Sequence, residues 1–126
     1  MQWKIWCEDK TGIVCIHNKG YLTNDDFKKQ VIEASACMSE HGSKLVLVDY
    51  RVLSSEINIF NIYDLPIFYK EIQFPIGARV AFLTSDELSV TQKEHFEFFE
   101  TVCVNTGYNV KLFKDEDAAR KWLSET

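Results

Sequence analysis

The sequence lacks the features of disordered, fibrous, exported and membrane-spanning chains. It has only five glycines and two prolines in 126 residues, and 46% of its residues are hydrophobic, which excludes collagen-like and low-complexity chains. Its apolar runs are only a few residues long, and no basic segment followed by a long hydrophobic stretch opens it. We therefore expect one cytoplasmic domain over residues 1–126, large enough to bury a core without a metal or disulfide.

Positive charge and catalytic motifs are also scarce. Fourteen Lys and Arg stand against nineteen Asp and Glu, and the net charge of −5 disfavours a nucleic-acid partner. The four cysteines form no C-x-x-C pair, so we expect thiols that fill the core. The sequence has no G-x-S-x-G, no phosphate-binding glycine loop and no H-E-x-x-H. We therefore predict a non-enzymatic protein with no metal and no cofactor.

Hydrophobic periodicity predicts an α/β chain whose elements alternate after an N-terminal β-hairpin. Helix 24–41 has Thr23 as its N-cap, Gly42 as its end, and Val31, Ala34 and Met38 on its core face, together with Phe27. Strands 44–49 and 78–85 are continuous apolar runs, typical of parallel strands covered on both faces. The other expected elements are hairpin strands 3–8 and 13–17, one kinked or two short helices over 55–74, helix 90–107, strand 108–113 and helix 114–125, which buries Ala119 and Leu123 or Ala118 and Trp122.

The element order and the segments "LVLVDYR", "ARVAFLT", "VKLF" and "AARKWL" resemble the SpoIIAA-like family of small bacterial proteins related to STAS domains. The resemblance implies a mixed four- to five-stranded sheet flanked by helices, in a cytosolic protein that binds or regulates others. STAS domains that antagonise anti-sigma factors carry a phosphoacceptor serine in an Asp-Ser-Ser/Thr-Gly-like turn. The matching region here, "SSEINIFN", lacks that turn, so Ser54 and Ser55 are only displaced counterparts, and Ser55 is also a good helix N-cap.

The carboxyl ends of the later strands are the first candidate binding site, because ligands of open α/β sheets bind where such ends meet. Asp49, Tyr50 and Arg51 follow one strand, Thr84, Ser85 and Asp86 the next, and Lys114 and Asp115 the last. The same residue types are also the usual turn and N-cap residues. Two alternatives stay open for this edge: STAS-like partner switching, and a small enzyme that uses Asp49, Arg51 and Asp86.

An excess of apolar residues marks the second candidate site. Between Ile57 and Phe74, eleven of eighteen positions are Ile, Leu, Phe or Tyr, whereas a core-facing helix needs about three in seven. The surplus is packed on both sides within the domain, forms a homodimer face, or lines a pocket for a small apolar ligand. The last reading also follows from the relation of this fold to CRAL-TRIO lipid-binding domains. We expect a ligand or a partner protein to bind here, through Phe60, Tyr63, Ile67 and Phe68.

Overall fold

The alternating apolar segments at the start of the chain form the predicted hairpin. In the computed structural model, which describes residues 3–18, 24–49, 70–72, 74–75, 77–84, 94, 97, 101 and 109–125, β1 (Trp3–Cys7) pairs with β2 (Ile13–Asn18) in antiparallel register. In the turn, the Glu8 N–H donates to the Ile13 carbonyl at 2.9 Å and the Gly12 N–H to the Glu8 carbonyl at 2.9 Å. Gly12 closes this turn with a φ of 71°, a conformation that glycine adopts without steric cost.

Helix α1 (Asn24–His41) follows the prediction in the described part of its core face, whereas the burial of Phe27 lies outside the described part. Val31, Ala34 and Met38 are buried, as their i, i+3, i+7 spacing predicts. The helix ends in a Schellman motif around Gly42, whose φ is 63°. The Ser43 N–H donates to the Met38 carbonyl at 2.9 Å, which satisfies one of the carbonyls left unpaired at a helix C-terminus.

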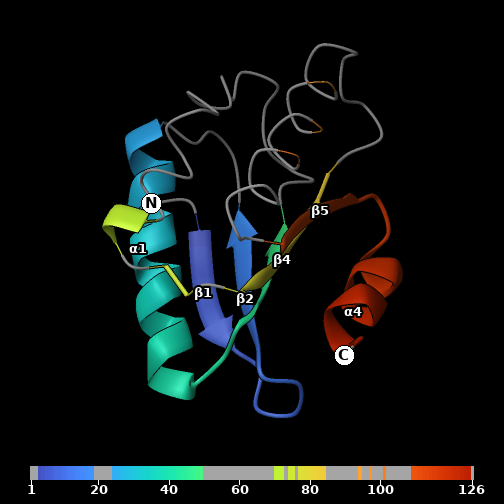
Figure 1. Ribbon diagram of the computed structural model, residues 1–126, viewed down its shortest axis with the longest axis horizontal. Helices are drawn as coiled ribbons and strands as arrows, with labels where there is room; N and C mark the ends of the chain where they lie inside the picture. The colour runs from blue at the N-terminus through green and yellow to red at the C-terminus, as the bar shows by residue number, and fades with distance from the viewer. Residues whose placement is uncertain are drawn as a thin grey trace.

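Three further strands join the hairpin in one sheet. They are β3 (Leu45–Asp49), β4 (Arg79–Leu83) and β5 (Asn109–Phe113), and the strand order is β1-β2-β3-β4-β5. Each of β3, β4 and β5 is parallel to the strand before it, so only β1 runs the other way (Figure 1). The described part therefore has the mixed sheet that the sequence predicts.

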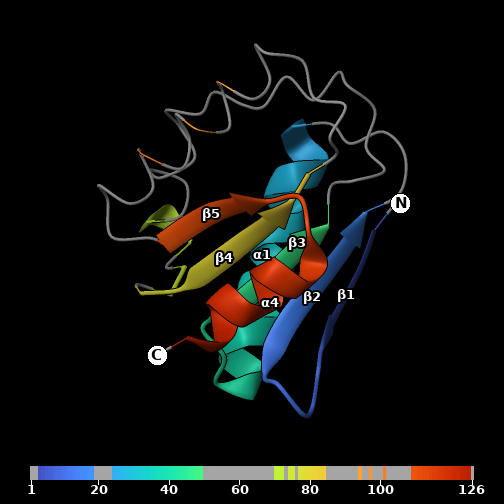
Figure 2. The same ribbon diagram turned by 90° about the vertical axis from the view of Figure 1, so that its right-hand side faces the viewer.

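The sheet is covered on both faces. Figure 2 shows helix α4 (Glu116–Ser124) in front of the sheet and α1 behind it. We call the two sides the α1 face and the α4 face. The α1-face core contains Val14, Ile16, Val31, Ala34, Met38, Val46, Val48, Phe74, Ala78, Val80, Phe82 and Val110. The α4-face core contains Ile13, Cys15, Leu47, Ala81, Leu83, Ala119 and Leu123. Alternate residues of β2 and β3 belong to opposite cores, as the two-residue period of a strand requires.

The last helix decides between the two predicted stripes. Ala119 and Leu123 are buried, whereas Ala118 is exposed and Trp122 only half-buried. Asp115 caps the helix by accepting a hydrogen bond from the Ala118 N–H at 3.2 Å.

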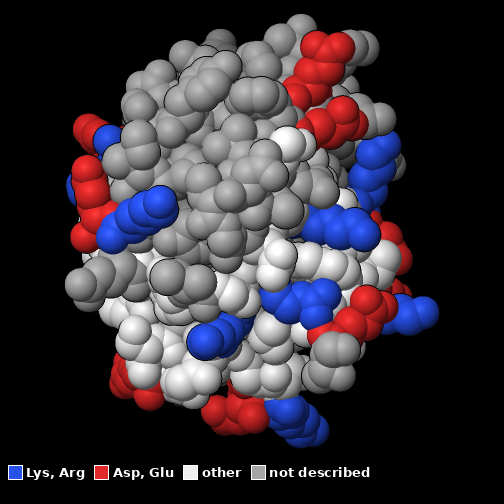
Figure 3. All heavy atoms as spheres, viewed as in Figure 1, with Lys and Arg blue, Asp and Glu red and all other residues white. Residues whose placement is uncertain are grey.

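Two predicted helical segments lie mostly outside the described residues. Lys70 and Glu71 of predicted helix 55–74 are helical, and so are Glu94, Glu97 and Thr101 of predicted helix 90–107. No helix in the described part is long and apolar enough to cross a membrane. On the face that Figure 3 shows, basic and acidic side chains are interspersed over the described part of the surface.

Candidate functional site

In the described part of the chain, the carboxyl ends of the parallel strands lie side by side, as the sequence predicts. The register places Asp49 beside Leu83 and Leu83 beside Phe113, the last residues of three neighbouring strands. Thr84 continues this edge: its N–H donates to the Phe113 carbonyl at 2.9 Å, and its side chain is buried. A ligand or partner at this edge would therefore meet residues from several strands at once.

The most polar feature of the edge is a histidine–aspartate pair. The parallel pairing of β2 with β3 puts His17 opposite Asp49, and His17 Nδ1 lies 3.4 Å from Asp49 Oδ2. The Asp49 side chain is only 13% exposed, whereas His17 is 41% exposed, so the imidazole is the member that an incoming molecule can reach. An aspartate in this place fixes the orientation of the imidazole and makes an ion pair with it when the ring is protonated.

Lys4 extends this pair into a row across three strands. Lys4 lies opposite His17 in the hairpin register, and His17 lies opposite Asp49. All three side chains are on the α4 face. His17 and Asp49 each lie two residues beyond a residue of the α4-face core, and Lys4 alternates with β1 residues that pack against the α1-face core. The row combines a basic side chain, an imidazole and a carboxylate at the carboxyl end of the sheet.

A buried hydrogen-bonded network supports the edge from the α1 face. The Gln30 side-chain amide of α1 donates from Nε2 to Asn18 Oδ1 at 2.6 Å, and Asn18 Nδ2 donates to the Asp49 carbonyl at 3.2 Å. Asn18 and Gln30 are 0% and 1% exposed. Among the described residues no buried side-chain nitrogen or oxygen lacks a hydrogen-bond partner, so this network holds the ends of β2 and β3 rigidly against α1.

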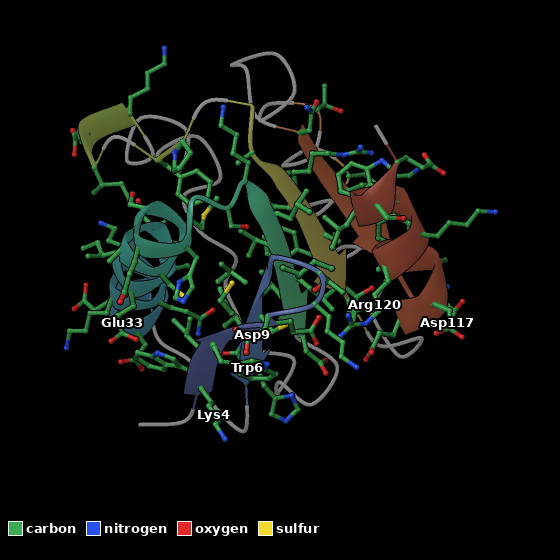
Figure 4. The ribbon with its side chains drawn as sticks, turned by 90° about the horizontal axis from the view of Figure 1, so that it is seen from below. Lys4, Trp6, Asp9, Glu33, Asp117 and Arg120 are labelled. Atoms are coloured by element: carbon green, nitrogen blue, oxygen red, sulfur yellow. The ribbon has the colours of Figure 1, made fainter. Side chains whose placement is uncertain are left out.

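A second charged cluster joins the hairpin turn to α4. Arg120 Nη1 and Nη2 donate to Glu8 Oε1 and Oε2 at 2.8 and 3.0 Å, and Arg120 Nε donates to Glu116 Oε2 at 3.0 Å. The hydrogen bonds from Arg120 lower the pKa of Glu8 to about 2, and those from Glu8 raise the pKa of Arg120. Figure 4 shows Arg120 reaching from α4 toward the side of the sheet where the hairpin turn lies. We call these three residues the hairpin clamp.

The nearby thiol of Cys15 is unsuited to redox chemistry. Burial, with a smaller contribution from the negative charge of Glu8, raises the pKa of Cys15 to about 12. Burial also raises the pKa of Cys37. Cys15 is buried and Cys7 and Cys37 are half-buried, which agrees with the expectation that the cysteines fill the core, whereas Cys103 lies outside the described residues.

The structure describes only part of the predicted site. It places Asp49 at the expected edge and gives Asp115 the role of a helix cap. In the apolar segment, Phe74 is buried and Ile72 packs against the α1-face core, so these two belong to the packed interior. Lys114 follows β5 as predicted and is exposed. Ten other predicted residues lie outside the described ranges: Tyr50, Arg51, Ser54, Ser55, Phe60, Tyr63, Ile67, Phe68, Ser85 and Asp86.

Four residues of the edge were not predicted from the sequence. His17 and Asn18 reach it because β2 is parallel to β3, which carries the end of β2 to the same side as Asp49. Lys4 follows through its pairing with His17, and Gln30 of α1 through its hydrogen bond to Asn18. The signal was present in the order of the elements: a strand, a helix and a strand in succession favour parallel pairing through a crossover. In the described part, no group of three or more His, Cys, Asp or Glu side chains could hold a metal ion.

No protein-family profile and no curated protein matches the sequence. The sheet with β1 antiparallel at one edge, α1 on one face and α4 on the other defines a SpoIIAA-like fold, which confirms the predicted fold class. The chain is similar to several solved structures, including the following two. One is an uncharacterized protein of the DUF3478 family with a SpoIIAA-like fold from Shewanella loihica PV-4, with 20% identity and a TM-score of 0.55 over 96% of this chain and 91% of that one. The other is the anti-sigma factor antagonist SpoIIAA in its unphosphorylated form, with 13% identity and a TM-score of 0.54 over 98% and 99%.

Proposed function

We propose that the protein is a non-enzymatic, cytoplasmic regulatory module of one domain over residues 1–126, and that it binds a partner protein at the carboxyl edge of its sheet. The observation that carries this proposal is the likeness to SpoIIAA over nearly the whole of both chains, since an anti-sigma factor antagonist acts by binding another protein. The likeness itself concerns the fold, and the binding role is our proposal.

The geometry of the edge supports this role. The exposed imidazole of His17 is held against Asp49, and the Asn18–Gln30 network fixes both strand ends in place. A surface that is rigid before binding loses little conformational entropy when a partner docks. We propose that Asp49, Arg51, Ser85 and Asp86 supply polar contacts and that residues 57–74 supply apolar ones.

A photo-crosslinking amino acid tests the proposal. It is placed at His17 or at Phe60, in the full chain expressed in its own host, and the crosslinked species are identified by mass spectrometry. We expect one protein to be captured from both positions. The matched control is Lys10, an exposed residue of the hairpin turn at the opposite end of the sheet. Capture of the same protein from Lys10, or of no protein from either test position, contradicts the proposal.

Enzymatic use of the same edge has a separate test. The alternative requires Asp49, with Arg51 and Asp86, to act on a small polar substrate. Under the proposal, Asp49→Asn weakens capture of the partner protein, and the purified chain has no enzymatic activity for this variant to remove. An activity of the purified chain that disappears in Asp49→Asn, while the unfolding curve is unchanged, would establish the enzyme instead.

A small apolar ligand is the second candidate for residues 57–74. It is favoured by the apolar surplus of that segment, of which only Ile72 and Phe74 are in the described core. A ligand that binds the native state must raise the melting temperature, by an amount that grows with ligand concentration. We expect a shift for at least one member of a fatty-acid panel if the segment lines a pocket. No shift across the panel rejects this candidate and leaves the partner protein.

Phosphorylation of Ser54 or Ser55 would extend the proposal to partner switching. Mass spectrometry of the chain purified from its host measures whether either serine carries phosphate. Ser54→Ala and Ser55→Ala then show whether partner capture depends on it. Because Ser55 is also a good N-cap, its Ala variant needs a stability measurement beside it.

A further inference from the structure

In the part of the chain that the structure describes, the outer side of β1 has no neighbouring strand. The order of the described strands begins with β1, which pairs with β2. The hydrogen bond from the Glu8 N–H to the Ile13 carbonyl makes these two residues a hydrogen-bonded pair. Hydrogen-bonded and non-hydrogen-bonded pairs alternate along an antiparallel hairpin, so Lys4 and Trp6 also direct their backbone N–H and C=O groups to β2. The backbone groups of Trp3, Ile5 and Cys7 therefore point outward. Such an edge is a template for pairing with another strand unless charge, proline or a bulge blocks it.

The side chains of β1 are unusual for a free edge. Trp6 is 40% exposed and is one of two large hydrophobic side chains that stand exposed in the described part of the chain. Lys4 is the strand's one charged residue, and its Nζ lies 5.9 Å from the centroid of the Trp6 ring. Figure 4 shows both side chains on β1, away from Glu33 of α1. A lysine above a tryptophan face is a favourable cation–π contact.

We propose that β1 binds a second copy of this chain by antiparallel β1–β1 pairing centred on Ile5. In that register Ile5 lies opposite Ile5 of the other copy, and the whole of Trp3–Cys7 is paired. Lys4 then lies opposite Trp6 of the other copy, and Trp6 opposite its Lys4. The two five-stranded sheets become one continuous sheet across a two-fold axis.

Charge and the length of β1 favour this register. Only registers that match odd-numbered with odd-numbered residues use the outward backbone groups. Shifting the centre to Lys4 would oppose two lysines, which is unfavourable in directly facing positions. Shifting it to Trp6 would leave Trp3 and Lys4 opposite positions beyond the end of the other copy's β1, and the Glu8 that Lys4 would face already binds Arg120. The Ile5-centred pairing is the one that places Lys4 of each copy opposite the Trp6 ring of the other.

This interface differs from the carboxyl edge of the proposed function, although Lys4 belongs to both. It lies along the outer side of β1, whereas His17 and Asp49 lie at the strand ends. Five residues a side make a small interface, so we expect a weak dimer that dissociates on dilution. Failure of partner capture at His17 would leave the β1 dimer standing, and the reverse also holds.

Register-specific disulfide crosslinking tests the pairing. Lys4→Cys and Trp6→Cys chains, both with Cys7→Ser to remove the native edge thiol, are mixed and mildly oxidised. The opposed positions 4 and 6 form a non-hydrogen-bonded pair with Cα atoms about 4.5 Å apart, within the range that a disulfide spans. We expect a crosslinked dimer in the mixture and at most a tenth as much in either variant alone. A mixture of Lys4→Cys with Lys10→Cys is the matched control.

Sedimentation velocity of the chain without added cysteines gives the second measurement. From about 10 µM to about 1 mM we expect the mean mass to rise toward twice the monomer mass, as for a weak interface. Trp6→Lys, which opposes two lysines, should abolish the rise, and Trp6→Phe should keep it. A monomer throughout this range, an unchanged rise in Trp6→Lys, or crosslinking of Trp6→Cys with itself would each overturn the pairing centred on Ile5. Crosslinking of Trp6→Cys to a different protein in the host would show that another partner uses this edge.

Discussion

The hairpin clamp should stabilise the folded chain through the coupling of Glu8 with Arg120. The folded protein holds the pKa of Glu8 at about 2, against an ordinary value of 4.5. At one pKa unit to about 1.4 kcal/mol, this difference sets a ceiling of about 3 kcal/mol on what the carboxylate contributes at neutral pH. The side chains are 31% exposed for Arg120 and 26% for Glu8, so water and salt screen the pair. We therefore expect a coupling of about 1–2 kcal/mol.

A double-mutant cycle measures this coupling. Urea unfolding of the parent chain, Glu8→Gln, Arg120→Gln and the double variant at pH 7 gives the four free energies that the cycle needs. Lys121→Gln, at an exposed position next along α4, is the matched control for loss of a positive charge and should change stability by less than about 0.5 kcal/mol. A coupling below about 0.3 kcal/mol would refute the reasoning, because the clamp would then be an ordinary surface ion pair.

The coupling should also depend on pH in one direction. The pKa of Glu8 is lower in the folded than in the unfolded state, so its stabilising contribution is present above about 4.5 and is lost as the pH falls toward 2. At pH 3 less than half of the neutral-pH contribution should remain. A coupling that is as large at pH 3 as at pH 7 would show that the carboxylate is not its source.

Three further variants test the packing by urea unfolding. Gln30→Leu removes the Nε2 donor of the buried Asn18 Oδ1 and should cost about 1–3 kcal/mol of stability. The double variant with Asn18→Leu should recover part of that loss. Equal losses in the single and the double variant would contradict the network. Leu123→Ala, which opens a cavity in the α4-face core, should cost about 2–5 kcal/mol, whereas a loss below about 1 kcal/mol would show that α4 is only loosely packed. Gly42→Ala should cost about 1–2 kcal/mol from its positive φ alone, since an added Cβ meets nothing within 4 Å; Gly42→Asn should cost less, and the opposite ranking would refute the cap.

Most of the fold could be predicted from local patterns in the sequence. The periodicities of helix 24–41 and of the hairpin depend on neighbours in sequence, so the hairpin itself and the buried positions Val31, Ala34 and Met38 of the helix were predicted from spacing alone. The last helix was left between two stripes because its Ala118–Trp122 and Ala119–Leu123 pairs have the same spacing. The sheet chose Ala119 and Leu123, which pack on the α4-face core, and left Trp122 at its margin.

The site was harder to predict because it depends on which strands become neighbours. Asp49 was predicted from its place at a strand end, and its partner His17 comes from a strand 32 positions earlier. The clamp had no sequence signal, since an arginine near one end of the chain and a glutamate near the other become partners only through the packing of α4 beside the hairpin. The family resemblance gave the fold correctly, but neither comparison structure is similar enough in sequence to carry a site over.

The 112 positions that separate Glu8 from Arg120 affect the order in which the chain can assemble during synthesis. The hairpin is synthesised more than a hundred positions before Arg120, and Ile13 and Cys15 of its α4 face are without their α4 partners during that time. Until α4 follows, the hairpin turn has a carboxylate without its guanidinium and an apolar face without its helix. The nascent chain therefore carries an uncovered apolar surface until α4 is made, which makes that surface a natural contact for a ribosome-associated chaperone.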